Sequence, residues 1–230
     1  MRFDVLTLFP ELIEAHMNYS IMKRAVEDGV IEVHTVNPRD YTHDKHRKVD
    51  DTPFGGGAGM VLMPQPYVDA YEGVNRVENS VTVMMTPQGE PLTDGISNEL
   101  AGYEQIIILC GHYEGFDERI REIIRPREIS VGDFVLTGGE LPALCLIDSV
   151  SRKIEGTLGK IESAHDDSFS DGLLEYPQYT KPREYRGLVV PEVLLNGNHK
   201  LIEEFRHEQK IARTKLKRPD LWEKYQSRKI

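Results

Sequence analysis

Short apolar runs alternate with segments of helical spacing over the first part of the chain. The runs at residues 3–9, 31–36, 81–85 and 106–109 predict strands, because they alternate or are continuously apolar as half-buried and buried strands are. The segments at residues 21–28, 94–101, 116–124 and 140–154 predict helices, the first of which stops at Gly29. Strands that alternate with helices indicate an α/β fold built on a parallel sheet.

The pattern changes after residue 154. Residues 155–175 are rich in Gly, Ser and Asp, which predicts a linker that is mobile without ligand. Beyond it, Asn198 can N-cap an amphipathic helix and Pro219 can open another. The sequence therefore predicts an α/β domain over residues 1–154, a linker over 155–175 and a small helical domain over 176–230.

Three glycine-bearing segments carry most of the chemical information. TPQG at 86–89 and CGHYEG at 110–115 follow predicted strands, and SVGDFVLTGGELPA at 130–143 runs from the strand-like EISV into a helix. Loops at strand ends are where α/β sheets bind ligands. If these loops meet, they form one pocket lined with backbone, which suits a nucleoside-sized ligand better than a metal ion.

These motifs carry a specific resemblance that extends over nearly the whole chain. Together with VDDTPFGGGAGM at 49–60, DDSFSDGLLEYPQYTKP at 166–182 and VLLNGNHKLIEEFR at 193–206, in this order, they resemble the bacterial tRNA (guanine-N1)-methyltransferases of the SPOUT superfamily. The resemblance implies a sheet whose C-terminal segments thread into a trefoil knot that holds the cofactor. Such knots are rare, and the hydrophobic pattern alone does not predict one.

The resemblance also implies the reaction and the partners. The expected reaction is methyl transfer from S-adenosyl-L-methionine to N1 of the guanosine immediately 3′ of the tRNA anticodon. The expected partners are the tRNA anticodon stem-loop and a second copy of the chain, in a homodimer with shared active sites. Assistance by Mg²⁺ is implied too, although the sequence shows no obvious carboxylate cage for it.

The three loops supply the expected cofactor-binding residues. Their glycines allow close approach of backbone to ligand, Glu114 can accept from the ribose, and Leu136 and Pro142 can cover the adenine faces. The set expected to bind the cofactor is Thr86, Pro87, Gln88, Gly89, Gly111, Tyr113, Glu114, Gly115, Val131, Gly132, Asp133, Phe134, Val135, Leu136, Gly138, Gly139 and Pro142. No GxGxxG follows the first predicted strand, so the pattern is not that of a dinucleotide site.

The expected catalytic residues are Asp167 and Arg152, by the resemblance. A carboxylate at Asp167 can accept the proton that guanine N1 loses, and a guanidinium at Arg152 can stabilise the charge that builds on O6. Ser168 is expected to help position the base. On the residues alone, Asp166 and Asp167 better suit ordinary loop or N-cap carboxylates, and Arg152 better suits a surface residue at a helix end; only the resemblance reverses this order.

A further substrate region is expected just before the glycine-rich segment at 55–59. There, His46 and Asp50 are expected to hold the tRNA and shape the site, again by the resemblance. His46 suits an RNA contact better than a zinc site, because no second His or Cys stands at ligand spacing. No metal ligands are therefore predicted.

Composition sets the remaining limits. The 230-residue chain has a net charge of −10, which is unusual for an RNA-binding protein, but residues 200–230 hold ten Lys or Arg and five Asp or Glu. That basic segment suits either a phosphate-facing patch or a solvated helix.

The two cysteines, Cys110 and Cys145, have apolar neighbours and are expected to be buried thiols. With no apolar run that spans a membrane and no signal-peptide pattern, a cytoplasmic location is expected.

The sequence also allows two other functions. A ribose 2′-O-methyltransferase of the same superfamily needs a stronger activating group than a loop carboxylate. A non-catalytic RNA-binding module is expected to lack the cofactor loops, all of which are present. The departures from the family pattern are Thr86 in place of serine, Phe134 in place of tyrosine and Phe205 in place of tryptophan. The second of these removes a hydroxyl from a cofactor loop.

Overall fold

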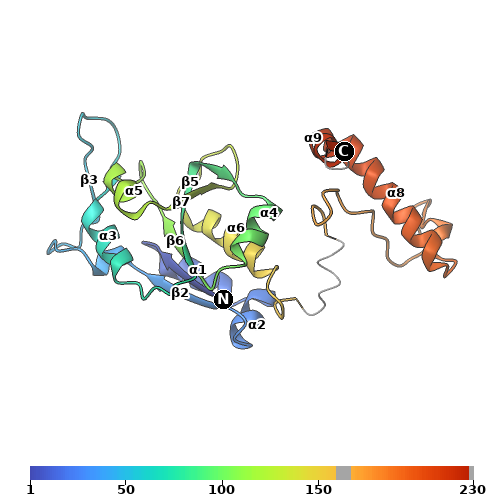
Figure 1. Ribbon diagram of the computed structural model, residues 1–230, viewed down its shortest axis with the longest axis horizontal. Coiled ribbons are helices and arrows are strands. Elements are labelled where there is room, and N and C mark those ends of the chain that lie inside the picture. Colours follow the sequence, from blue (N-terminus) through green and yellow to red (C-terminus); the bar gives the residue numbers. More distant parts are fainter. Residues whose placement is uncertain (159–166, 228–230) are drawn as a thin grey trace. The chain divides into compact units, whose positions relative to one another are not determined.

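The chain folds into two compact units, Met1–Gly159 and Lys160–Ile230. The structure is a computed structural model that describes residues 1–158 and 167–227, so Asp166 lies outside the described part. Figure 1 shows the helices and strands of both units. None of the helices in the described residues is both long and apolar enough to cross a membrane.

The first unit is built on a five-stranded sheet in the order β2-β1-β6-β5-β7. Every neighbouring pair in it is parallel, which confirms the predicted α/β class. The strands are β1 (Arg2–Leu6), β2 (Glu32–Val36), β5 (Ser80–Pro91), β6 (Gln105–Cys110) and β7 (Arg127–Ser130). All six residues of β6 are buried, as expected for a continuously apolar strand at the centre of a parallel sheet.

Helices cover both faces of this sheet, and each face has its own core. On one face lie α1 (Pro10–Met17), α2 (Ser20–Glu27), α4 (Asp94–Leu100) and α6 (Glu140–Ser151), whose buried side chains join one hydrophobic cluster. On the other face lie α3 (Pro64–Glu72) and α5 (Glu118–Ile124), whose buried side chains pack with Leu6, Met84 and Leu109. The unit is thus a three-layer sandwich, in which the ends of β5, β6 and β7 lie side by side (Figure 1).

Several boundaries differ from the sequence-based expectation. β1 ends at Leu6, and Pro10 opens α1 instead of closing the strand, because a proline fits the first turn of a helix. Pro64 opens α3 in the same way. β5 continues past Met85 to Pro91 with an irregular register against β7, so the expected loop at 86–89 is a bulge within a strand.

The glycine-rich segment connects a short antiparallel pair, β3 (Asp50–Asp51) and β4 (Val61–Leu62). A 3₁₀ turn, η1 (Pro38–Asp40), precedes it. Gly55, Gly56, Gly57 and Gly59 all have positive φ, a conformation that other residues avoid. The side chain of Phe54, at the start of the turn, is fully exposed within the chain.

The second unit is mainly helical, with α8 (His199–Lys217) and α9 (Pro219–Ser227). Asn198 caps α8 by accepting from the Leu201 amide (3.4 Å), and Pro219 is the first residue of α9, as predicted. The unit also contains a hairpin, β8 (Glu184–Tyr185) with β9 (Leu188–Val189), and a 3₁₀ turn, η2 (Glu192–Leu194), which the sequence did not suggest.

From Asp167 onward, the segment expected to be a linker is folded against α8. The Leu174 amide donates to the Thr214 hydroxyl (2.9 Å), and the Lys210 ammonium pairs with Asp171 (2.6 Å). Leu173 and Tyr176 are buried. These two buried side chains hold the segment in place, which its Gly, Ser and Asp content did not predict.

Candidate functional site

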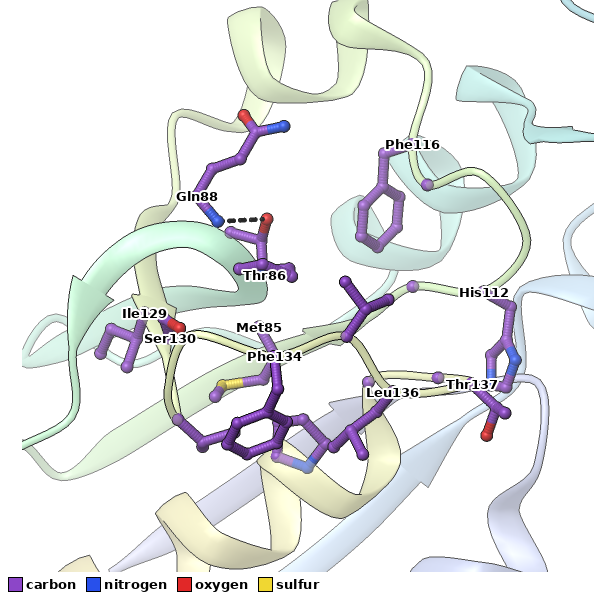
Figure 2. A pocket seen from close by; sticks show the side chains of 18 of the residues that line it. Met85, Thr86, Gln88, His112, Phe116, Ile129, Ser130, Phe134, Leu136 and Thr137 are labelled. Atoms are coloured by element: carbon purple, nitrogen blue, oxygen red, sulfur yellow. Dashed lines mark hydrogen bonds between the residues drawn. The ribbon is translucent and has the colours of Figure 1, made fainter. Parts of the chain in front are cut away.

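A cavity of about 310 Å³ lies at the C-terminal ends of β5, β6 and β7. Its walls come from residues 85–88 of β5, residues 111–116 after β6, the loop between β7 and α6, and Arg121 of α5 (Figure 2). The loops meet here because parallel strands place their carboxyl ends at one edge of the sheet. The prediction that the three segments form one pocket is confirmed geometrically.

All the residues expected to bind the cofactor line this cavity except Gly89 and Asp133. Gly89 instead packs on β7, since a Cβ at this position would lie 2.3 Å from the Ile129 nitrogen. Seven further lining residues were not expected: Met85, His112, Phe116, Arg121, Ile129, Ser130 and Thr137. His112 lies inside the CGHYEG motif, so the sequence contains a signal for it. Phe116 and Arg121 carry none, because they fit the pattern of ordinary core or helical residues.

The loop between β7 and α6 crosses over the end of β6. The Gly139 amide donates to the Gly111 carbonyl oxygen (2.8 Å), and His112 and Gly138 form an antiparallel bridge. A Cβ on Gly139 would lie 2.7 Å from Cα of Cys110, so only glycine allows so close a crossing. This crossing gives the cavity its floor.

The cavity mouth carries apolar side chains that water reaches. Phe134, Val135 and Leu136 are 54%, 83% and 40% exposed, and Tyr113 is half exposed with a positive φ of 60°. Apolar surface around a few convergent backbone groups is typical of sites for planar organic ligands. The residues present therefore fit the adenosyl part of S-adenosyl-L-methionine.

One pair of ionisable side chains lies at the cavity wall. His112 Nε2 lies 2.6 Å from Glu140 Oε2, and the other carboxylate oxygen of Glu140 accepts from the Thr7 hydroxyl at 2.6 Å. Burial raises the pKa of the Cys110 thiol and the pKa of the Tyr67 phenol well above their usual values, and the charge of Glu140 adds to both shifts. Neither the Cys110 thiol nor the Tyr67 phenol is therefore poised to ionise near neutral pH.

The two cysteines differ in exposure. Cys110 is buried at the end of β6, as expected, but Cys145 is exposed. The expectation for Cys145 is therefore wrong: α6 turns one side toward solvent, and the apolar neighbours of Cys145 in sequence occupy the other side. Among the described residues, no group of three or more His, Cys, Asp or Glu could hold a metal ion.

Comparison of the sequence with known proteins shows the family of this chain. A family model described as tRNA (Guanine-1)-methyltransferase TrmD matches residues 1–224. The chain belongs to the tRNA (guanine-N1)-methyltransferase family. It is 57% identical over 225 residues to a tRNA (guanine-N(1)-)-methyltransferase of Staphylococcus epidermidis, which covers 98% of this chain and 92% of the relative. The enzymes of that name from Staphylococcus carnosus and Staphylococcus haemolyticus are 55% and 54% identical over the same shares.

In this member of the family, the expected catalytic residues lie in different units. Arg152 follows α6 directly as its C-cap in the first unit. Asp167 and Ser168 open the described part of the second unit, where the Ser168 hydroxyl accepts from the Glu175 amide (3.0 Å) and the Asp167 carbonyl from the Ser170 hydroxyl (2.8 Å). None of these three lines the cavity of the first unit.

The expected substrate residues lie beside the glycine-rich segment of this family member. Asp50 is half-buried in β3, and the His46 amide donates to the Asp44 carboxylate (2.8 Å). Hydrogen bonds from the Lys48 and His46 amides lower the pKa of Asp44. Neither His46 nor Asp50 lines the cavity, so a role for them in binding tRNA stays a prediction.

Proposed function

We propose that the chain transfers a methyl group from S-adenosyl-L-methionine to N1 of the guanosine immediately 3′ of the anticodon in tRNA. The observation that carries this proposal is the match of residues 1–224 to the family model, which extends over both units. The cavity at the strand ends supports it, because its apolar mouth suits an adenine ring and its backbone groups suit a ribose. The reaction is assigned to the cytoplasm, where its tRNA substrate is found.

The chemistry assigns a role to each expected catalytic residue. When bound, S-adenosyl-L-methionine would supply an electrophilic methyl group, whose bond to sulfur breaks so that S-adenosyl-L-homocysteine leaves. Asp167 takes the N1 proton of guanine as the new N–C bond forms, so that the product base is neutral. Arg152 places a guanidinium near O6, where negative charge develops while the proton leaves. Ser168 holds the turn that carries Asp167, through its bond to the Glu175 amide.

The crossing at Gly139 supports a trefoil knot around the cofactor. The loop between β7 and α6 lies against the backbone of Cys110 and Gly111, which is the close contact that threading of this segment requires. Mg²⁺ assistance is part of the family resemblance, and no residues of this chain are assigned to it. The basic second unit is assigned to the anticodon stem-loop, because residues 200–230 carry an excess of Lys and Arg.

The proposed assembly is a homodimer in which each active site combines the cavity of one subunit with Asp167 of the other. Mixing two inactive variants tests it. Asp167→Ala lacks the base and Gly139→Val lacks a usable cavity, so a heterodimer with shared sites regains one intact site. Return of up to half the activity per mixed dimer is expected. No return of activity on mixing contradicts shared sites.

The proposed base is tested by single-turnover methyl transfer at saturating cofactor. Asp167→Asn should slow transfer to tRNA by about 10²–10⁴-fold while cofactor affinity stays nearly unchanged, since a general base contributes about that much. Glu27→Gln, which removes an exposed carboxylate at the end of α2 in the first unit, is the matched control and should keep the wild-type rate.

The product of the same assay identifies the reaction. Digestion of the methylated tRNA should yield 1-methylguanosine, and a tRNA with adenosine 3′ of the anticodon should not be methylated. A 2′-O-methylated nucleoside would instead identify the ribose methyltransferase. No transfer with any tRNA, despite cofactor binding, would contradict the proposed function. A wild-type rate in Asp167→Asn would contradict only the assignment of the base.

A further inference from the structure

Glu140 is a buried carboxylate for which the proposed reaction has no use. It is 2% exposed, and a carboxylate is costly to bury unless it is hydrogen-bonded or paired. Both of its oxygens are satisfied, Oε1 by the Thr7 hydroxyl and Oε2 by His112 Nε2, each at 2.6 Å. Glu140 is also the first residue of α6, where the positive end of the helix dipole favours a negative charge.

The direction of these hydrogen bonds follows from their neighbours. The Phe9 amide donates to the Thr7 hydroxyl oxygen (2.9 Å), which leaves the hydroxyl hydrogen free to point at Glu140. An ionised carboxylate only accepts, so His112 bonds to Glu140 through an Nε2–H group. The result is a directed Thr7–Glu140–His112 chain that begins just after β1 and ends at the cavity.

The Thr7–Glu140–His112 chain joins segments that are far apart in sequence. Thr7 and Glu140 are 133 residues apart, and His112 and Glu140 are 28 apart. The ring of Phe9 packs against the ring of His112 with centroids 4.7 Å apart, which leaves the imidazole little freedom. A Cβ on Gly138 would lie 2.2 Å from His112 Cε1 and 2.6 Å from Glu140 Oε2, so this backbone is fitted closely around the pair.

Only the last member of the chain reaches the cavity. His112 lines it (Figure 2). Gly138 and Gly139 line it too, whereas Glu140 and Thr7 do not. Any effect of Glu140 on a ligand must therefore pass through the position of His112 and of the two loops that the pair connects. Those loops carry most of the cavity wall.

We propose that the Thr7–Glu140–His112 chain presets the spacing of the two cofactor loops, with Glu140 and His112 as positioning residues for cofactor binding. Loops that are already in place before binding lose little conformational entropy when the ligand binds, so their affinity for the cofactor is higher. This inference rests on the proposed function, because it takes the cavity ligand to be S-adenosyl-L-methionine.

Glu140→Gln tests the inference with little change of shape. The amide keeps an oxygen for the Thr7 hydroxyl but no longer offers His112 a charged acceptor. Calorimetric titration with S-adenosyl-L-methionine should show affinity about tenfold weaker or more, as expected for loss of a hydrogen bond to a charged group. In steady-state assays, KM for the cofactor should rise by a similar factor, while kcat at saturating cofactor changes less than about threefold.

Asp4→Asn is the matched control. Asp4 is also a 2%-exposed carboxylate, and it accepts from the Gln105 side-chain amide (2.7 Å), but it does not line the cavity. Asp4→Asn should lower the melting temperature and leave cofactor affinity within about twofold of wild type. Thr7→Val, which breaks the Thr7–Glu140–His112 chain outside the cavity, should weaken cofactor binding by about threefold or more, and it carries the test if Glu140→Gln does not fold.

Three results would overturn the inference. The first is wild-type affinity in a folded Glu140→Gln or Thr7→Val protein. The second is a loss confined to kcat, which would place Glu140 in the chemistry or in tRNA binding. The third is an equal loss of affinity in Asp4→Asn, which would make the effect one of overall stability. Failure of the wild-type protein to bind the cofactor would instead contradict the proposed function.

Discussion

Gly139→Ala should damage the cavity through steric contact alone. Gly139 has φ −82° and ψ −7°, which alanine adopts without strain, so the backbone itself does not demand glycine here. The added methyl group, however, would lie 2.7 Å from Cα of Cys110 and 2.8 Å from the Gly111 nitrogen. Both are backbone atoms, and Cys110 is fully buried in the central strand, so they have little room to move.

The size of the effect follows from these contacts. Overpacking by one methyl group against a rigid core costs about 1–3 kcal/mol. Movement of the loop would also lengthen the bond from the Gly139 amide to the Gly111 carbonyl, which contributes about 1 kcal/mol. A loss of roughly 2–4 kcal/mol leaves a typical domain folded but distorts the loop that forms the cavity floor. Cofactor affinity should fall by at least about tenfold, the equivalent of one hydrogen bond of roughly 1.4 kcal/mol.

Urea unfolding and calorimetric titration measure the two effects separately. Gly95→Ala in α4 is the control, because the nearest atom to its new methyl group would be the Thr93 hydroxyl oxygen at 3.7 Å. It should stabilise the protein by up to about 1 kcal/mol, as alanine does inside helices, with no change in cofactor affinity. Wild-type stability and affinity in Gly139→Ala would refute the steric explanation of the crossing.

Two further predictions follow from other parts of the molecule. Lys210→Met should lower stability by about 1 kcal/mol or less, because its partner Asp171 is partly exposed. Because the pair anchors the turn that carries Asp167, the substitution should also reduce kcat while KM for the cofactor stays unchanged. An unchanged single-turnover rate would contradict this prediction. Alkylation of the native protein, followed by mass spectrometry, should label Cys145 and leave Cys110 unmodified, because burial and a raised pKa both protect the Cys110 thiol. Rapid labelling of both cysteines would be inconsistent with the burial of Cys110.

The sequence predicted the sheet because its strands are short apolar runs with clear boundaries. It missed α1 because Pro10 was expected to end the first strand, although a proline equally well begins a helix. It also gave no prediction for α3, which Pro64 opens. It also missed the folding of residues 167–176 onto α8. There a few buried side chains outweigh a composition that is otherwise typical of a linker.

The cavity was predictable because the ends of parallel strands lie at one edge of the sheet. The motifs at those ends contain most of the residues that line it. The pairing of His112 with Glu140, and of Glu140 with Thr7, was not predictable. Each contact depends on how the loop between β7 and α6 crosses β6, and no local pattern in the sequence encodes that crossing. The role of Gly89 was not predictable either. It was expected to bind the cofactor, whereas it allows β5 to pack closely on β7.

The crossing at Gly139 also sets an order of events during synthesis. Thr7 leaves the ribosome early, but its partner Glu140 and the loop that forms the cavity floor emerge only after β7. Contacts of such long sequence separation form late and slowly, because much of the chain must be ordered before they are gained. A nascent chain that stops before α6 can therefore form strands but cannot retain the cofactor. Cofactor retention thus reports completion of the first unit and can serve as a read-out of its folding on the ribosome.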